Sequence, residues 1–212
     1  VTWPSAELER HQAGPGPKRI LGRRGGGVRG LLTVGMLQRI EDTLRAQSGG
    51  SAKFVLSDYF DLIAGTSTGS IIATLLALGR PVAQIKEFYE AFAPRVFAKA
   101  QAAGARKPRF NAAAFEGLLQ EKLGDLTLGS PELRTGLLIC AKRMDTGSQW
   151  TINNDPRSKY YNKPGSKTLP NKDYLLRTLV RASTAAPFYF EPAKVVIANH
   201  PHYPKEVGMF VD

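Results

Sequence analysis

The sequence predicts an α/β layer fold with a mostly parallel central sheet and a serine nucleophile elbow. Short apolar segments of strand length alternate with segments of helical periodicity along the chain, which is typical of such layer folds. A short turn joins one pair of predicted strands, so we expect a single antiparallel excursion, in which one strand pair of the otherwise parallel sheet runs antiparallel. The stretch "DLIAGTSTGSIIATLLALG" places a serine on a tight turn between an apolar strand and an apolar helix.

The first elements follow from local patterns. Residues 1–18 are polar and rich in glycine and proline and predict an N-terminal arm, whereas residues 19–212 predict one domain. Residues 19–21 predict a short strand that ends in a glycine-rich turn. Residues 30–47 predict a helix, because apolar side chains recur on one helical face: Leu31, Val34, Leu37, Ile40 and Leu44.

The later elements are predicted in the same way. Pro81 suits the first turn of a helix, Asn111 suits an N-cap, and Pro187 ends the last helix. The turn "DTGS" predicts a hairpin. Helices are therefore expected at 70–78, 81–97, 111–123 and 173–185, and strands at 60–65, 136–144, 149–154, 194–199 and 208–212.

Composition narrows the class of protein. The 212 residues are 42% hydrophobic and 22% charged, which is ordinary for one globular domain. No apolar run has the length of a membrane span, and the N-terminus lacks the apolar core of a secretory signal. Cys140 is the only cysteine, which excludes an internal disulfide and a cysteine metal site. We expect no metal and no cofactor, and a cytoplasmic location, peripheral at a membrane.

The charge indicates an anionic partner. The formal net charge is +11, which favours nucleic acid, an acidic membrane surface or acidic ligands. An ordinary solvated surface is the alternative. The basic residues gather in three patches, which comprise Lys18, Arg19, Arg23, Arg24 and Arg29, then Arg106, Lys107 and Arg109, then Arg157, Lys159, Lys163, Lys167 and Lys172.

Ser67 lies in a G-x-S-x-G pattern formed by Gly65, Thr66, Ser67, Thr68 and Gly69. The two glycines remove side chains that would collide where strand and helix pass closely. The start of the following helix offers unpaired N–H groups and a partial positive charge. The pattern therefore predicts an exposed nucleophilic hydroxyl, although small-residue turns of this kind also serve packing alone.

A second glycine cluster, "GGGVRG", follows the first strand and matches G-x-G-x-x-G at Gly25, Gly27 and Gly30. A dinucleotide site also needs an acidic residue at the end of a second strand. The acidic residues near that spacing, Glu41 and Asp42, fall inside a predicted helix. An oxyanion hole built from the N–H groups of Gly25, Gly26 and Gly27 is the better interpretation.

No histidine has the position of a catalytic base. His11 falls in the predicted arm, and His200 and His202 fall in a proline-broken loop before the last strand. Asp212 follows that strand, and the carboxyl ends of parallel strands are where α/β folds place their sites. An aspartate there can accept the Ser67 proton directly, which predicts a Ser–Asp dyad.

In this order, "GGGVRG", "GTSTG" and an aspartate after a short strand resemble the patatin-like phospholipase family. The segment "RASTAAPFYFEP", residues 181–192, resembles the one that this family carries before its catalytic aspartate. The resemblance spans residues 19–212. It implies a three-layer α/β/α sandwich with a mostly parallel central sheet. It also implies a lipid acyl hydrolase, phospholipase A-like, that acts without metal, with Ser67 as nucleophile, Asp212 as base and an oxyanion hole around Gly26 and Gly27. Lipid esters and an anionic membrane surface are the implied partners.

Two features depart from the family pattern. Arg24 stands where the family usually has an aspartate, and we expect Arg23 and Arg24 to perturb the glycine loop, unless Arg24 serves as a phosphate contact. The sequence also stops at Asp212, where the family continues with glycine and more chain. We therefore expect a fragment, truncated at its C-terminal end, that is a poor catalyst by itself.

Two other functions stay open at this stage. Arg24 favours a catalytically silent patatin-fold scaffold, which a fluorophosphonate probe would not label at Ser67. The charge and "GGGVRG" favour a nucleotide- or nucleic-acid-binding module. That module lacks a suitable acidic residue and an aromatic RNA-binding signature, so we do not expect nucleic acid as the partner.

Overall fold

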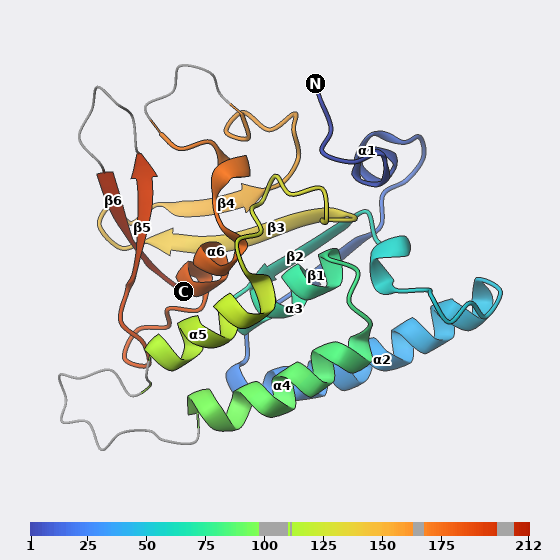
Figure 1. Cartoon of the computed structure of the whole chain (residues 1–212), viewed down its shortest axis with the longest axis horizontal. Helices are drawn as coiled ribbons and strands as arrows, with labels where there is room; N and C mark the ends of the chain where they lie inside the picture. The colour runs from blue at the N-terminus through green and yellow to red at the C-terminus, as the bar shows by residue number, and fades with distance from the viewer. Residues whose placement is uncertain (98–109, 111, 163–167, 199–205) are drawn as a thin grey trace.

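A computed structural model describes residues 1–97, 110, 112–162, 168–198 and 206–212 (Figure 1). Six strands form one sheet in the order β1-β2-β3-β6-β5, and β4 pairs with β3 off this path. Their bounds are β1 Ile20–Arg23, β2 Leu62–Thr66, β3 Gly136–Arg143, β4 Gln149–Asn153, β5 Ala193–Ala198 and β6 Glu206–Val211.

The strand directions confirm a mostly parallel sheet and correct one detail. Strands β1, β2 and β3 are mutually parallel. Strand β6 is antiparallel to both β3 and β5, so β5 runs in the same direction as β3. The expected single antiparallel excursion is wrong, because β3–β4, β3–β6 and β5–β6 are all antiparallel pairs. Two hairpins thus extend the parallel core, since neighbouring segments pair most simply in that way.

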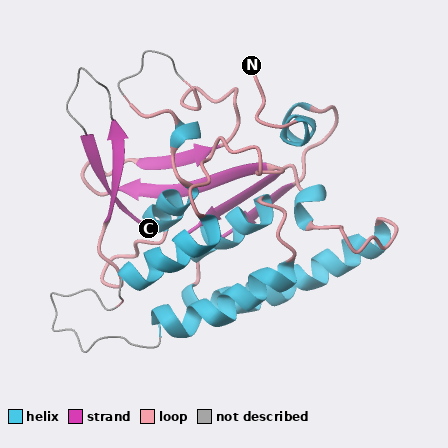
Figure 2. Ribbon diagram, in the orientation of Figure 1, coloured by secondary structure: helices cyan, strands magenta, loops and turns pink. Residues whose placement is uncertain are grey.

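In the view of Figure 1, helices α2, α4 and α5 lie mainly below the sheet, α3 and α6 overlap its strands, and α1 (Ala6–Ala13) lies at the upper right; Figure 2 shows the same arrangement by type of element. Helix α3 packs on β2 and α6 on β3, and every residue of α3 is buried. Ile63, Leu137 and Ile139 on the same sheet face are fully buried. The helices are α2 Gly30–Gln47, α3 Thr68–Ala77, α4 Val82–Phe97, α5 Ala112–Leu123 and α6 Leu176–Ser183.

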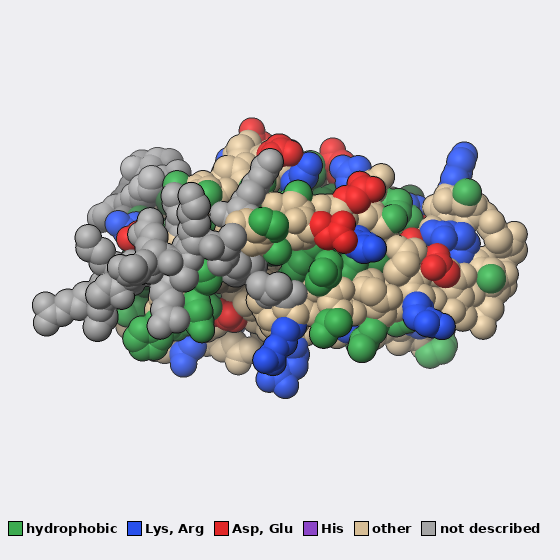
Figure 3. All heavy atoms as spheres, turned by 90° about the horizontal axis from the view of Figure 1, so that it is seen from below, with side chains coloured by type: hydrophobic (Ala, Val, Ile, Leu, Met, Phe, Trp, Pro, Cys, Tyr) green, Lys and Arg blue, Asp and Glu red, His purple; other side chains and the backbone are tan. Residues whose placement is uncertain are grey.

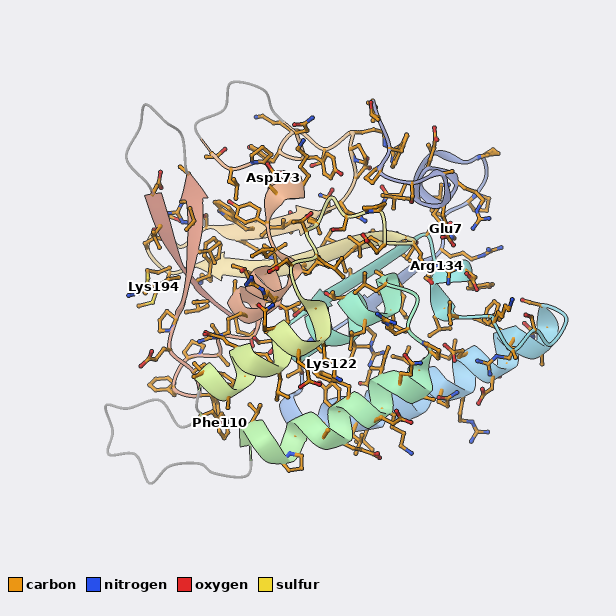
Figure 4. All side chains as sticks on the ribbon, in the orientation of Figure 1. Glu7, Phe110, Lys122, Arg134, Asp173 and Lys194 are labelled. Atoms are coloured by element: carbon orange, nitrogen blue, oxygen red, sulfur yellow. The ribbon has the colours of Figure 1, made fainter. Side chains whose placement is uncertain are left out.

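The segment expected to form an arm contains helix α1, Ala6–Ala13. Ser5 caps it, and Leu8 is fully buried. Glu7 forms an ion pair with Arg134, with 2.9 Å between Oε1 and Nη2, and the two side chains lie together in Figure 4. A polar sequence that is poor in apolar residues therefore folds as a helix, because contacts with distant parts of the chain stabilise it.

Some predictions fall outside the described residues. These are the Asn111 cap, the basic residues Arg106, Lys107, Arg109, Lys163 and Lys167, and the two loop histidines His200 and His202. Helix α6 is shorter than expected because it ends at Ser183 and not at residue 185. Within the described part of the chain, no helix has the length and apolar character needed to span a membrane.

Candidate active site

The turn around Ser67 has the strained geometry of a nucleophile elbow. Ser67 has φ 53° and ψ −136°, a left-handed backbone that L-residues rarely adopt. A Cβ atom on Gly65 would lie 2.3 Å from the carbonyl oxygen of Gly69, and one on Gly69 would lie 2.7 Å from that of Arg23. Both positions therefore require glycine, and the predicted strand–turn–helix arrangement is confirmed.

Ser183, the last residue of α6, holds the strained turn from the other side. Its hydroxyl accepts a hydrogen bond from the Ser67 backbone N–H at 2.9 Å and donates one to the carbonyl oxygen of Cys140 in β3. Ser183 is fully buried. Sequence reasoning did not assign it, although it belongs to the segment 181–192 that carries part of the family resemblance.

The glycine loop after β1 lies against the elbow. A Cβ atom on Gly25 would lie 2.3 Å from Cβ of Ser67, so the loop and Ser67 are in direct contact. The N–H groups of Gly26 and Gly27 both donate to Oγ1 of Thr68, each at 3.1 Å. These donors, predicted to bind an oxyanion, thus converge on one neutral oxygen beside Ser67. Gly30 begins α2.

Asp212 lies beside Ser67, but not for the reason expected. It follows β6, which is antiparallel to β3, and not a strand of the parallel set. The β6 end reaches the site because Val211 pairs with Lys142, close to the carboxyl end of β3. Asp212 as a whole residue is exposed, but desolvation of its carboxylate raises its pKa, while the side chains of Ser67 and Thr66 act in the opposite direction.

These groups line one cavity of about 650 Å³. Its polar wall contains Ser67 and Asp212, and its apolar wall contains the aromatic residues Phe110, Phe115, Tyr189 and Phe190. The rings of Phe110 and Tyr189 stack with their centroids 5.6 Å apart. Figure 4 shows Phe110 just before α5, at the end where α4 also stops. A nucleophilic hydroxyl beside an apolar pocket suits an ester with a hydrocarbon chain.

Arg23 and Arg24, the two basic residues before the glycine loop, have different surroundings. The Arg23 guanidinium donates to the Thr33 hydroxyl of α2, and partial burial lowers its pKa. Arg24 is exposed and lines the cavity beside Ser67. Its expected effect on the glycine loop stays a prediction.

His11 lies far from this cavity along the sheet. It is buried, and its Nδ1 atom lies 2.9 Å from Oδ1 of Asp61, which precedes β2. Ser67 follows the other end of β2. The Glu41 and Asp42 carboxylates lie within α2, as the sequence predicted, so they do not end a strand.

Comparisons with known proteins agree with this geometry. A family model described as patatin-like phospholipase matches residues 24–212. The chain is 31% identical over 183 residues to "Patatin-like protein 1" of Oryza sativa subsp. indica, covering 80% of the chain and 41% of that protein. It is 28% identical over 185 residues to "cGAMP-activated phospholipase" of Vibrio cholerae serotype O1, covering 82% of the chain and 49% of that protein.

A third relative and a solved structure complete the comparison. "cUMP-AMP-activated phospholipase" of Escherichia coli is 37% identical over 128 residues, covering 60% of the chain and 35% of that protein. The crystal structure of VipD from Legionella pneumophila shares the fold, with a TM-score of 0.54 at 12% identity, covering 95% of the chain and 47% of that structure. The chain therefore spans less than half the length of these curated relatives.

Proposed function

Because the chain belongs to the patatin-like phospholipase family, we propose that it is a lipid acyl hydrolase that cleaves fatty-acyl esters of membrane lipids. Ser67 is the nucleophile and Asp212 is the base. The observation that carries this proposal is the meeting of a strained serine with a carboxylate in one cavity that has an aromatic wall.

The proposed reaction is acyl transfer in two steps. Asp212 accepts the proton of the Ser67 hydroxyl while the Ser67 oxygen attacks the ester carbonyl, and the alcohol portion of the lipid leaves with a proton. The fatty-acyl group is then an ester of Ser67. A water molecule, deprotonated by the same carboxylate, attacks that ester and releases the fatty acid. Ser67 and Asp212 line the same cavity, and the Ser67 side chain acts to lower the pKa of Asp212; both observations support this proton path.

The glycine loop would stabilise the negative oxygen of each tetrahedral intermediate. The N–H groups of Gly26 and Gly27 already converge on one oxygen atom, and Gly25 contacts the nucleophile. Removing one such donor from other serine hydrolases costs about 3 kcal/mol. Helix α3 begins at Thr68, so the positive end of its dipole faces the same place.

The decisive experiment combines chemical labelling with a lipid panel. Wild-type protein, Ser67→Ala and Asp212→Asn are treated with a fluorophosphonate probe and then with phospholipids of defined head group. We expect labelling and fatty-acid release from the wild type only, with all three proteins equally folded by circular dichroism. Release at the wild-type rate by Ser67→Ala would reject the assignment of the nucleophile.

A catalytically silent scaffold is the second candidate, and two observations favour it. Arg24 borders the cavity, and the Thr68 hydroxyl already accepts the two loop N–H groups. The same experiment separates the candidates, because a scaffold would show neither labelling of Ser67 nor release of fatty acid.

We also propose that the mouth of the cavity meets an anionic lipid surface. Phe188 is 85% exposed and has φ 68°, although its neighbours Tyr189 and Phe190 line the cavity. Arg24, which also lines the cavity, and Arg29 are exposed just before α2. Within α2, Leu32 and Met36 are 72% and 65% exposed. Figure 3 shows hydrophobic and basic side chains alternating along its lower edge. Apolar and cationic groups together suit an anionic bilayer surface.

A further inference from the structure

Thr68, which directly follows the nucleophile, is the residue that connects the elbow to the glycine loop. It is 6% exposed and begins α3. Its Oγ1 atom accepts the N–H groups of both Gly26 and Gly27 at 3.1 Å. The neutral hydroxyl oxygen therefore occupies the kind of position, between two converging donors, that an oxyanion prefers.

Few described atoms pack around the α-carbons of these two glycines. A Cβ atom on Gly27 would meet no described atom within 4 Å, and one on Gly26 would meet only Cβ of Arg29, at 3.5 Å. Gly27 also has φ +55°. Glycine adopts positive and negative φ values with similar energy, so its own backbone does not favour this one conformation. Within the loop, the Arg29 N–H donates to the Gly26 carbonyl oxygen at 3.0 Å. The two bonds to Thr68 are the side-chain hydrogen bonds that tie this turn to the elbow.

Tyr89 of α4 supports this arrangement from behind. It is fully buried, and a Cβ atom on Gly30 would lie 2.3 Å from its hydroxyl oxygen. Burial raises the pKa of Tyr89, and the nearby Thr68 side chain acts in the opposite direction. Tyr89 thus contacts both the end of the glycine loop and the residue that holds its middle.

We propose that Thr68 is a positioning residue for the oxyanion hole. In the resting protein its hydroxyl keeps the Gly26 and Gly27 N–H groups aligned, and these groups turn to the substrate oxygen when it becomes negative. The exchange is favourable because a hydrogen bond to an anion is about twice as strong as one to a neutral oxygen. This inference rests on the proposed acyl transfer and deepens it.

The test compares Thr68→Val, which removes the hydroxyl at nearly constant volume, with Thr68→Ser, which keeps it. Thr74→Val is the matched control, because Thr74 is a buried threonine of the same helix whose hydroxyl has no hydrogen-bond partner among the described residues. On a short-chain ester, we expect Thr68→Val to lower kcat about tenfold or more with KM nearly unchanged, because a misaligned donor weakens only the transition state. Thr68→Ser restores most of kcat, and Thr74→Val keeps it.

A second measurement does not depend on turnover. Amide hydrogen exchange of the peptide that contains residues 24–30 should become faster in Thr68→Val but not in Thr68→Ser or Thr74→Val. Unchanged exchange, an unchanged kcat in Thr68→Val, or an equal loss of kcat in Thr74→Val would overturn the positioning role. A wild-type protein with no esterase activity would instead reject the proposed function, and hydrogen exchange would still decide whether Thr68 holds the loop.

Discussion

The hydroxyl of Ser183 accepts the backbone N–H of Ser67 at 2.9 Å, although the two residues are 116 positions apart in the chain. The same hydroxyl donates to the Cys140 carbonyl in β3. One buried side chain thus connects α6, the sheet and the strained turn. Because a positive φ at a non-glycine residue costs about 1–3 kcal/mol, such a turn needs surrounding contacts that hold it in place.

Ser183→Ala is therefore expected to impair both stability and catalysis. The change leaves the Ser67 N–H without its acceptor, which costs about 1–3 kcal/mol for a buried group. We expect a lower unfolding midpoint in urea and a reduced kcat with little change in KM. The control is Ser57→Ala, because Ser57 is also fully buried but its hydroxyl has no partner among the described residues. Equal losses of stability in the two variants would contradict the bridging role.

The raised pKa of Asp212 predicts the pH dependence of the reaction. Desolvation of the carboxylate raises this pKa above its ordinary value of 3.8, against the opposing effect of the Ser67 and Thr66 side chains. The proposed base, Asp212, can accept a proton only when it is ionised, so kcat/KM should rise with pH through the raised pKa and level off above it. The measurement is kcat/KM of a neutral short-chain ester against pH.

Two variants identify the group that titrates. Asp212→Asn should abolish activity over the whole pH range. Asp155→Asn should keep the same profile, because Asp155 pairs with Arg157 outside the catalytic cavity. A profile with its midpoint at or below 3.8 would contradict the raised pKa.

Arg24→Asp tests the departure from the family pattern. A guanidinium only donates hydrogen bonds, whereas a carboxylate can accept N–H groups of the turn that it precedes. We expect Arg24→Asp to raise kcat on a short-chain ester by about threefold to tenfold, as one better-aligned donor would. Arg24→Gln removes the charge alone and serves as the control. A lower kcat in Arg24→Asp on anionic phospholipids would instead identify Arg24 as a phosphate contact.

The elbow could be predicted from sequence because its requirements are local. Gly65 and Gly69 must be glycine for steric reasons, and the flanking strand and helix are apolar. The bonds that hold the site are not local. Ser183 lies 116 residues from Ser67, and Thr68 lies 42 residues from Gly26. Periodicity carries no information about contacts at such separations.

The same argument applies to helix α1 and strand β6. Helix α1 depends on the ion pair of Glu7 with Arg134, 127 residues away, and on the burial of Leu8, so its own composition predicted an arm. The β6 strand has the same alternation in either direction, so sequence could place Asp212 at a strand end but could not give the direction of that strand.

The exposed aromatic side chain at the cavity mouth predicts how the protein binds membranes. Phe188 is 85% exposed, and inserting such a ring into a bilayer interface releases about 1–2 kcal/mol, part of the value for full burial. Phe188→Ser should therefore weaken binding to anionic phosphatidylglycerol vesicles by about tenfold, while hydrolysis of a soluble short-chain ester stays unchanged. Tyr160→Ser is the control, because Tyr160 is 57% exposed but does not line the cavity.

Binding of the wild type should also fall as salt is raised, since exposed charges such as Arg24 and Arg29 are screened within about 8–10 Å at physiological ionic strength. Vesicle co-sedimentation measures both effects, and equal, salt-independent binding to neutral and anionic vesicles would reject this docking surface.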